Sequence, residues 1–215
     1  MLDDERSKVA AAARALAADG LVHGTSGNVS ARRDDLVAIT PTGAVLAEVE
    51  PEHVTVVSLD GEVVAGDLAP TSEADLHLGV YRRYDAGAVV HTHAPVATAL
   101  SCVLDELPCV HYEMLLLGGA VRVAPYATFG TPELAASVVD ALEGKTATLL
   151  ANHGTVTFGA DVDAAVKATE LLEWACGVYW HARAIGEPQV LGATEQAAVI
   201  EAAVRRGYGS TKPAG

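Results

Sequence analysis

Apolar residues recur at helical spacing near the start of the chain. One helix face would carry Val9, Ala12, Ala13 and Leu16, after an acidic start and before Gly20. Apolar positions three and four residues apart are typical of an amphipathic helix, and glycine ends a helix readily because it tolerates a left-handed backbone. The pattern therefore predicts a helix that stops at about Gly20.

The pattern changes to short β-branched runs in the next part of the chain. The runs 37–40 and 54–57 are rich in valine, isoleucine and threonine, and turn residues follow at 41–43 and at 60–61. Such runs, bounded by proline, glycine and aspartate, are typical of strands joined by tight turns. The sequence predicts two strands and their turns here.

The rest of the chain mixes both kinds of pattern. The same reasoning assigns helices to 72–84, to a short segment opened by Pro95, to 131–144, 163–185 and 194–206, and strands to 88–93 and 147–151. Strands and helices mix without a strict alternating unit, which favours a three-layer α/β/α sheet protein over a barrel. We expect one domain over 1–215, with a mobile Gly/Pro-rich tail from about 207.

Composition supports a folded protein and limits its partners. Half of the 215 residues are hydrophobic and the mean hydropathy is +0.26, so a sizeable core is expected. The formal charge of −14 disfavours nucleic acid and anionic membranes as partners. No apolar run reaches the about 18 residues of a membrane span and no signal peptide is evident, so a cytoplasmic location is expected.

The three cysteines are interpreted as ordinary reduced thiols. Cys102, Cys109 and Cys176 lack the spacing of a disulfide framework or of a thiolate metal site.

Two histidines near the end of a predicted strand point to a metal site. Residues two apart on a strand share a face, so His91 and His93 can bind one ion. A catalytic zinc site usually takes three protein ligands. His153 is the best third candidate, because it ends another apolar strand and Gly154 would let the backbone turn away. The alternative is that each ring is a hydrogen-bonded core or turn histidine.

Glu73 lies at a predicted helix start. An acidic residue at this position often only complements the helix dipole. Beside a metal ion, however, it could be a fourth ligand that substrate displaces and that then acts as a general base. The remaining histidines have no partner at chelating spacing and are interpreted as surface or packing residues: His23, His53, His77 and His181.

Three short loops offer groups that bind anions. The segments 24–30, 40–43 and 70–72 combine glycines, hydroxyl side chains and free backbone N–H groups. Each alone is more often a plain turn or helix cap, but together they indicate a phosphate site. No Walker motif and no Gly-x-Gly-x-x-Gly is present, which argues against nucleoside triphosphates and NAD.

Taken in order, these motifs resemble those of the class II aldolase and adducin-head family. They are Gly24-Thr-Ser-Gly-Asn28, Thr40-Pro-Thr-Gly43, Pro70-Thr-Ser-Glu73, His91-Thr-His93, His111-Tyr112 and Asn152-His-Gly154. The stretch Ala124-Pro-Tyr-Ala-Thr-Phe-Gly130 adds similarity to members that act on L-fuculose 1-phosphate. The resemblance implies a mixed, largely antiparallel sheet and a zinc-dependent aldehyde-lyase. Such an enzyme reversibly cleaves a ketose 1-phosphate to dihydroxyacetone phosphate and an aldehyde such as lactaldehyde.

The resemblance also implies roles for individual residues. One Zn²⁺ per subunit would be held by Glu73, His91, His93 and His153, with Glu73 also acting as acid/base. Phosphate would be held by Gly27, Asn28, Thr42, Gly43, Thr71 and Ser72. Tyr112 would reach in from a neighbouring subunit of a homotetramer to handle the proton on the aldehyde oxygen. Phe129 and Tyr208 would cover the aldehyde end.

Other functions fit parts of the same pattern. An L-ribulose-5-phosphate 4-epimerase shares the metal and the cleavage chemistry. Glu113 lies close to the sequence position at which this branch carries a carboxylate that serves as one of its two proton carriers. A dehydratase acting on methylthioribulose 1-phosphate and aldolases for 5-deoxypentulose 1-phosphates also fit the motifs. An adducin-like binding module without catalysis is the non-enzymatic alternative, which the presence of all three histidines and Glu73 disfavours.

Overall fold

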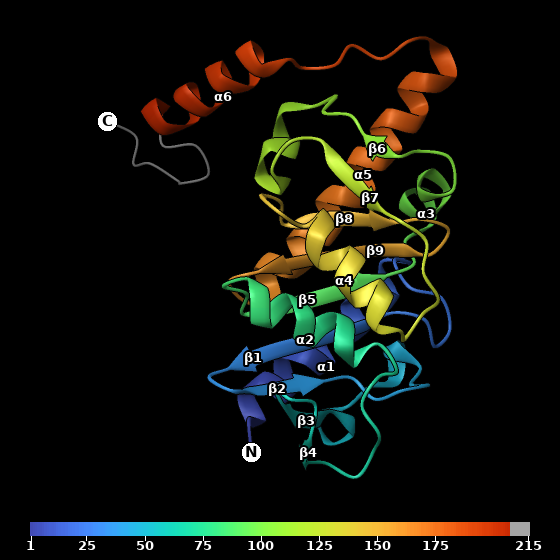
Figure 1. Cartoon of the computed structure of the whole chain (residues 1–215), viewed down its shortest axis with the longest axis vertical. Coiled ribbons are helices and arrows are strands. Elements are labelled where there is room, and N and C mark those ends of the chain that lie inside the picture. The colour runs from blue at the N-terminus through green and yellow to red at the C-terminus, as the bar shows by residue number, and fades with distance from the viewer. Residues whose placement is uncertain (207–215) are drawn as a thin grey trace.

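The computed structural model describes residues 1–206, in which helices surround a central sheet (Figure 1). The α-helices are α1 (Asp3–Ala18), α2 (Ala74–Arg83), α3 (Pro95–Ser101), α4 (Pro132–Ala141), α5 (Val162–Ile185) and α6 (Ala193–Arg206). The 3₁₀ helices are η1 (Leu46–Glu48), η2 (Pro51–His53) and η3 (Tyr112–Leu117). The tail from 207, with Tyr208, lies outside the described residues.

The strands form one mixed sheet in the order β4-β3-β2-β1-β5-β9-β8-β7-β6. They are β1 (Asn28–Arg33), β2 (Leu36–Ile39), β3 (Thr55–Ser58), β4 (Val63–Ala65), β5 (Ala88–Thr92), β6 (Glu106–Leu107), β7 (Val121–Ala124), β8 (Ala147–Leu150) and β9 (Gly154–Gly159). Neighbouring strands are antiparallel except β7 and β8, which are parallel. The sheet is therefore largely antiparallel, as predicted.

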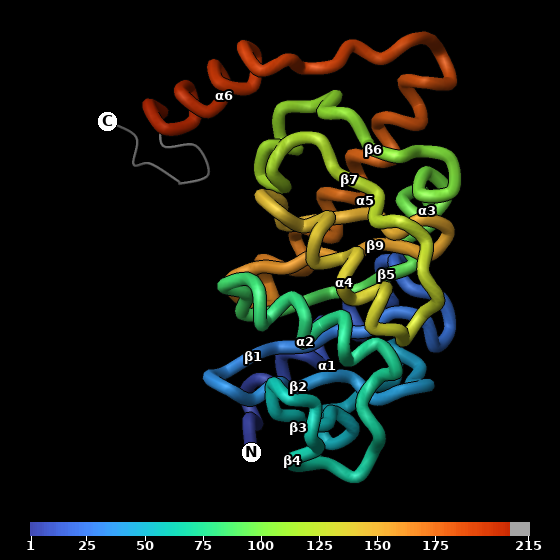
Figure 2. Tube along the Cα trace, viewed as in Figure 1, coloured from blue at the N-terminus to red at the C-terminus, as the bar shows by residue number. Residues whose placement is uncertain are grey.

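Helices cover both faces of the sheet. In Figure 1, α2 and α4 lie in front of the strands, whereas α1 and α5 lie behind them. The tube in Figure 2 shows that α6 extends away from this body after α5, and α6 buries none of its side chains. The predicted three-layer α/β/α architecture is confirmed.

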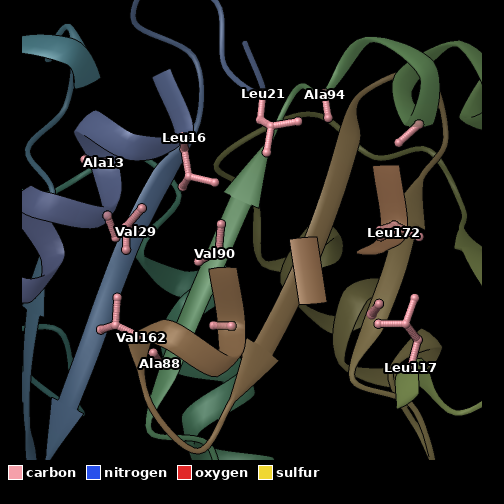
Figure 3. Packing of buried hydrophobic residues seen from close by; sticks show 14 of the residues in the cluster. Ala13, Leu16, Leu21, Val29, Ala88, Val90, Ala94, Leu117, Val162 and Leu172 are labelled. Carbon is pink, nitrogen blue, oxygen red and sulfur yellow. The ribbon is translucent and has the colours of Figure 1, made fainter. Parts of the chain in front are cut away.

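A separate apolar cluster fills the space on each side of the sheet. On the side of α1 and α5, Leu16 packs in one cluster with Val29, Val90 and Leu172 (Figure 3). On the other side, side chains of α2 and α4 pack with Val89 and residues of β2. Val89 and Val90 are neighbours on β5 that point to opposite faces. β5 is therefore buried on both faces, and it leads into the predicted metal site.

The helices predicted from the sequence are confirmed to within a few residues. The predicted strands at 37–40, 54–57, 88–93 and 147–151 correspond to β2, β3, β5 and β8. The sequence reading missed β1, β4, β6, β7 and β9 as strands. The loop expected over 24–30 is shorter, because β1 begins at Asn28. In the described part of the chain, no helix is long and apolar enough to cross a membrane.

Candidate metal and phosphate site

Three histidine side chains meet where the central strands β5 and β8 end. His91, His93 and His153 each offer one ring nitrogen, and these three atoms lie within 4.8 Å of one another. The Nε2 atoms of His91 and His93 are 3.1 Å apart. Three imidazoles that converge in this way can serve as ligands of one divalent metal ion.

The sheet register explains why the rings converge. His91 lies on β5 and pairs with Asn28 of β1. His93 follows β5 by one residue, so its side chain leaves the chain on the same side as that of His91. His153 lies in the tight connection between β8 and β9, after Asn152, whose φ of 55° is left-handed. Strand spacing and one turn thus bring the three rings together.

Glu73 lies directly before α2 and faces the histidines. Its Oε2 is 3.2 Å from Nε2 of His91 and accepts a hydrogen bond of 3.0 Å from Nδ2 of Asn28. Its Oε1 is 3.5 Å from Nε2 of His153, and this buried oxygen accepts no hydrogen bond from any residue in 1–206. An unsatisfied buried carboxylate oxygen is costly, and a cation bound here would offset that cost.

The protonation states in the cluster suit a metal ion. Burial raises the pKa of Glu73, but the contact with the His91 ring, the hydrogen bond from Asn28 and the nearby His153 hold that pKa well below its usual range. Burial and the other two rings lower the pKa of His93 to about 4, and burial and His91 lower the pKa of His153. At neutral pH, Glu73 is therefore ionised, and His93 and His153 are neutral. These are the forms that bind metal.

The lone pair of His91 also faces the cluster. Nδ1 of His91 lies 2.8 Å from the carbonyl oxygen of Thr155. Because a carbonyl only accepts, Nδ1 donates, which leaves Nε2 as the ring atom whose lone pair can bind a metal ion. Two nitrogens bound to one tetrahedral zinc at about 2.0–2.1 Å would be about 3.3 Å apart, close to the 3.1 Å between His91 and His93. The residues present fit a divalent metal ion.

Gly154 allows β9 to approach β5 beside the cluster. The left-handed angle in this turn belongs to Asn152, not to Gly154 as expected from the sequence. A Cβ on Gly154 would instead lie 2.3 Å from the carbonyl oxygen of Thr92. The glycine is therefore required for space.

We expect Gly154→Ala to lower the free energy of unfolding by about 2 kcal/mol or more, because the backbone at this contact must shift. Gly177→Ala is the matched control: Gly177 lies within α5, and its added Cβ would meet nothing within 4 Å. That control should gain about 0.5–1 kcal/mol. Denaturant titration of the metal-free proteins measures both, and equal stabilities would contradict the close approach.

The three predicted anion-binding loops line one pocket with the metal cluster. This pocket has a volume of about 440 Å³. Its lining includes Thr25, Ser26, Gly27, Asn28, Pro41, Thr42, Gly43, Thr71, Ser72, Glu73, Tyr126, Ala127, Phe129, Asn152, and two of the histidines, His93 and His153. His91 lies deeper, with no exposed surface. The structure thus brings the predicted phosphate residues and the predicted metal ligands together.

Backbone contacts hold the three loops side by side. Thr40 N–H donates to the carbonyl of Val29, and Thr71 N–H donates to the carbonyl of Thr40, both at 3.0 Å. Pro41 and Pro70 form an isolated antiparallel bridge. Gly27 has a φ of 91°, and a Cβ there would lie 2.8 Å from Cγ1 of Val22. These contacts therefore fix the loops relative to one another along one side of the pocket.

The predicted aldehyde-end residues have different positions. Phe129 lines the pocket and is 66% exposed. Tyr126 also lines it and was not singled out from the sequence. Tyr112 is absent from this lining and borders a second hollow, of about 380 Å³, together with Glu113 and residues of α6. Tyr208 lies outside the described residues. Within one chain, Tyr112 is thus not part of the histidine pocket.

His77 is the residue that sequence reasoning undervalued. It is fully buried, and its ring lies 2.7 Å from Oγ of Ser30 and 2.5 Å from Oδ1 of Asn28. Asn28 in turn donates to Glu73. The four-residue spacing from Glu73 to His77 was a usable signal, because residues four apart share a helix face. The other three unassigned histidines are exposed, as expected: His23, His53 and His181.

Comparison with known proteins identifies the family. Residues 7–180 match the model of the Class II Aldolase and Adducin N-terminal domain. The chain belongs to this family. A 5-deoxy-D-ribulose 1-phosphate aldolase of Bacillus thuringiensis serovar kurstaki is 40% identical, covering 89% of this chain and 91% of that protein. An L-fuculose phosphate aldolase of Escherichia coli K12 is 38% identical, covering 84% of this chain and 85% of that protein.

Solved structures agree with this membership. An L-fuculose 1-phosphate aldolase superposes with a TM-score of 0.89 at 37% identity, covering 93% of this chain and 95% of that one. The expected class II aldolase fold is confirmed. The relatives are named aldolases, which confirms the prediction of an aldehyde-lyase class. Class II aldolases depend on a metal ion, and the three-histidine cluster of this chain could hold one.

Proposed function

We propose that the protein is a zinc-dependent aldolase that reversibly cleaves a ketose 1-phosphate to dihydroxyacetone phosphate and a small aldehyde. One observation carries the proposal: the three imidazoles and Glu73 border the same pocket as the three anion-binding loops. A sugar phosphate needs both parts, because its phosphate must be held while its ketone is activated.

The metal site takes His91, His93 and His153 as ligands, with Glu73 as a further ligand when no substrate is bound. Zinc suits three neutral imidazoles and a carboxylate. When bound, zinc supplies a Lewis acid that polarises the ketone oxygen and stabilises the negative charge developing during C–C cleavage. The unsatisfied Oε1 of Glu73 supports a cation at this position.

The phosphate is held by the loops at 27–28, 42–43 and 71–72. Their hydroxyls and glycine-flanked N–H groups suit a dianion in a protein whose formal charge is −14. This local attraction fixes one end of the substrate. The reacting carbons then lie toward Glu73 and the histidines, which line the same pocket.

Glu73 moves the proton on carbon. Its depressed pKa keeps the carboxylate ionised at neutral pH, so in the condensation direction it removes a proton from dihydroxyacetone phosphate. In the cleavage direction it returns that proton. A second group must serve the aldehyde oxygen, and we assign this role to Tyr112 of a neighbouring subunit in a homotetramer. Its position outside the histidine pocket of its own chain supports this assignment.

The aldehyde end of the pocket is bordered by Tyr126, Ala127 and Phe129. These side chains suit an aldehyde that ends in a methyl group, with Tyr208 as a further proposed cover. L-Fuculose 1-phosphate would release lactaldehyde and 5-deoxyribulose 1-phosphate would release acetaldehyde, and both products end in methyl. Relatives named for each substrate are 38% and 40% identical to this chain, which does not favour either one.

The proposal is tested by incubating the zinc-loaded protein separately with L-fuculose 1-phosphate, 5-deoxyribulose 1-phosphate and L-ribulose 5-phosphate. We expect dihydroxyacetone phosphate from at least one of the first two, loss of activity with a chelator, and recovery with zinc. Conversion of the pentulose alone, without triose release, would show an epimerase. A protein that neither holds zinc nor gains activity from it would indicate a binding module.

A further inference from the structure

A chain of buried hydrogen bonds runs from the core to Glu73. Oγ of Ser30 lies 2.7 Å from the hydroxyl of Tyr81 and 2.7 Å from Nδ1 of His77. Nε2 of His77 lies 2.5 Å from Oδ1 of Asn28, and Nδ2 of Asn28 lies 3.0 Å from Oε2 of Glu73. All five residues are buried.

Two regular elements supply this chain. Asn28 and Ser30 are two apart on β1 and therefore share one face of the sheet. His77 and Tyr81 are four apart on α2 and share one face of that helix. α2 packs on the sheet, on the side seen in Figure 1. The helix thus brings an imidazole over the strand that carries the pocket amide.

The orientation of the Asn28 amide sets the donors and acceptors in the chain. Nδ2 of Asn28 donates to Oε2 of Glu73, so the amide turns its carbonyl oxygen to His77. Nε2 of His77 must then donate. Burial and the nearby His91 lower the pKa of His77 to about 3, so the ring is neutral and Nδ1 accepts from Ser30. Ser30 in turn accepts from Tyr81.

We propose that His77 is a positioning residue that fixes the Asn28 amide, and through it the Glu73 carboxylate, in the orientation needed for proton transfer. The inference rests on the proposed function, since Glu73 is the proton carrier there. Without the donor at Nε2, the amide of Asn28 could rotate and turn its oxygen to Glu73, where two acceptors would repel. Glu73 also faces the three histidines, so the orientation of its carboxylate determines whether an oxygen can reach the substrate carbon from which the proton is removed.

Two substitutions of His77 distinguish the hydrogen bond made by Nε2 from the one made by Nδ1. Glutamine carries its amide at about the reach of Nε2, so His77→Gln can still donate to Asn28. Asparagine carries its amide at about the reach of Nδ1, so His77→Asn keeps the Ser30 side and loses the donor to Asn28. We expect His77→Asn to lower kcat/KM by about 10- to 100-fold, as loss of an outer partner of an active-site ligand does. His77→Gln should retain most of the activity.

Tyr81→Phe is the matched structural control. It removes a buried hydrogen bond from the same chain, but Ser30 can still donate to His77 and the Asn28 amide stays fixed. We expect Tyr81→Phe to lower the unfolding temperature and to leave kcat/KM within about three-fold of wild type. That change is much smaller than the loss of about 10- to 100-fold expected for His77→Asn. If kcat/KM of all three variants falls in proportion to their loss of stability, His77 has only a structural role and the inference is wrong.

Two further measurements test the inference, and the second of them needs no substrate. In the Glu73→Gln background, His77→Asn should cause no further loss, because residues that act through one another are not additive. ¹⁵N spectra of the wild-type protein should show His77 protonated at Nε2 and unprotonated at Nδ1 at neutral pH. The opposite tautomer would overturn the inference even if the protein cleaved no sugar phosphate, so the two failures remain distinguishable.

Discussion

His93→Ala is expected to lose bound zinc and aldolase activity together. His93 is one of three rings whose nitrogens lie within 4.8 Å of one another. With two imidazoles left, the site falls below the three protein ligands usual for catalytic zinc. Metal content after dialysis and the rate of triose release measure the two effects in the same sample. We expect less than about a tenth of wild-type zinc and no cleavage above background.

His181→Ala is the control for this prediction. His181 is exposed on α5, and its ring contacts the Gly177 carbonyl within the same helix. The His181→Ala protein should bind zinc and cleave substrate as the wild-type protein does. A His93→Ala protein that retained its full zinc content would show that the ligand set is wrong, whatever its activity.

Glu73→Gln should separate metal binding from proton transfer. The three imidazoles remain, so zinc and substrate should still bind. The amide cannot act as a base, and kcat should fall by about 10²-fold or more. Zinc analysis, substrate affinity and initial rates give the three readouts.

Asp75→Asn is the matched control, because it removes the same charge two residues away on the exposed side of α2. Its kcat should stay near that of wild type. Turnover by Glu73→Gln at the wild-type rate would remove Glu73 from the proton-transfer step, while leaving it as a neighbour of the metal cluster.

Local patterns were enough to predict most of the residues that the structure brings together in the candidate site. His91 and His93 follow from the two-residue period of a strand, and His153 from its place at the end of an apolar run. The glycine and hydroxyl loops follow from the groups that bind anions. What the sequence could not give was the pairing of β1 with β5, which sets Asn28 opposite His91. That contact joins residues far apart in the chain.

Two of the missed strands, β1 and β9, share a physical cause. β9 buries Thr155 and Thr157, and their hydroxyls are satisfied by Thr92 and Thr169 on other elements. β1 likewise buries polar side chains near Glu73 and His77. Buried polar groups are tolerated when tertiary partners supply hydrogen bonds. A pattern of apolar and polar positions does not show such partners, so these strands resemble loops.

Anomalous X-ray diffraction at the zinc edge, from crystals grown with zinc, would locate the metal ion itself. We expect one peak per subunit, about 2.0–2.1 Å from a ring nitrogen of each of His91, His93 and His153. A peak at any other group, or none at these rings in a protein that cleaves ketose phosphates, would contradict this expectation.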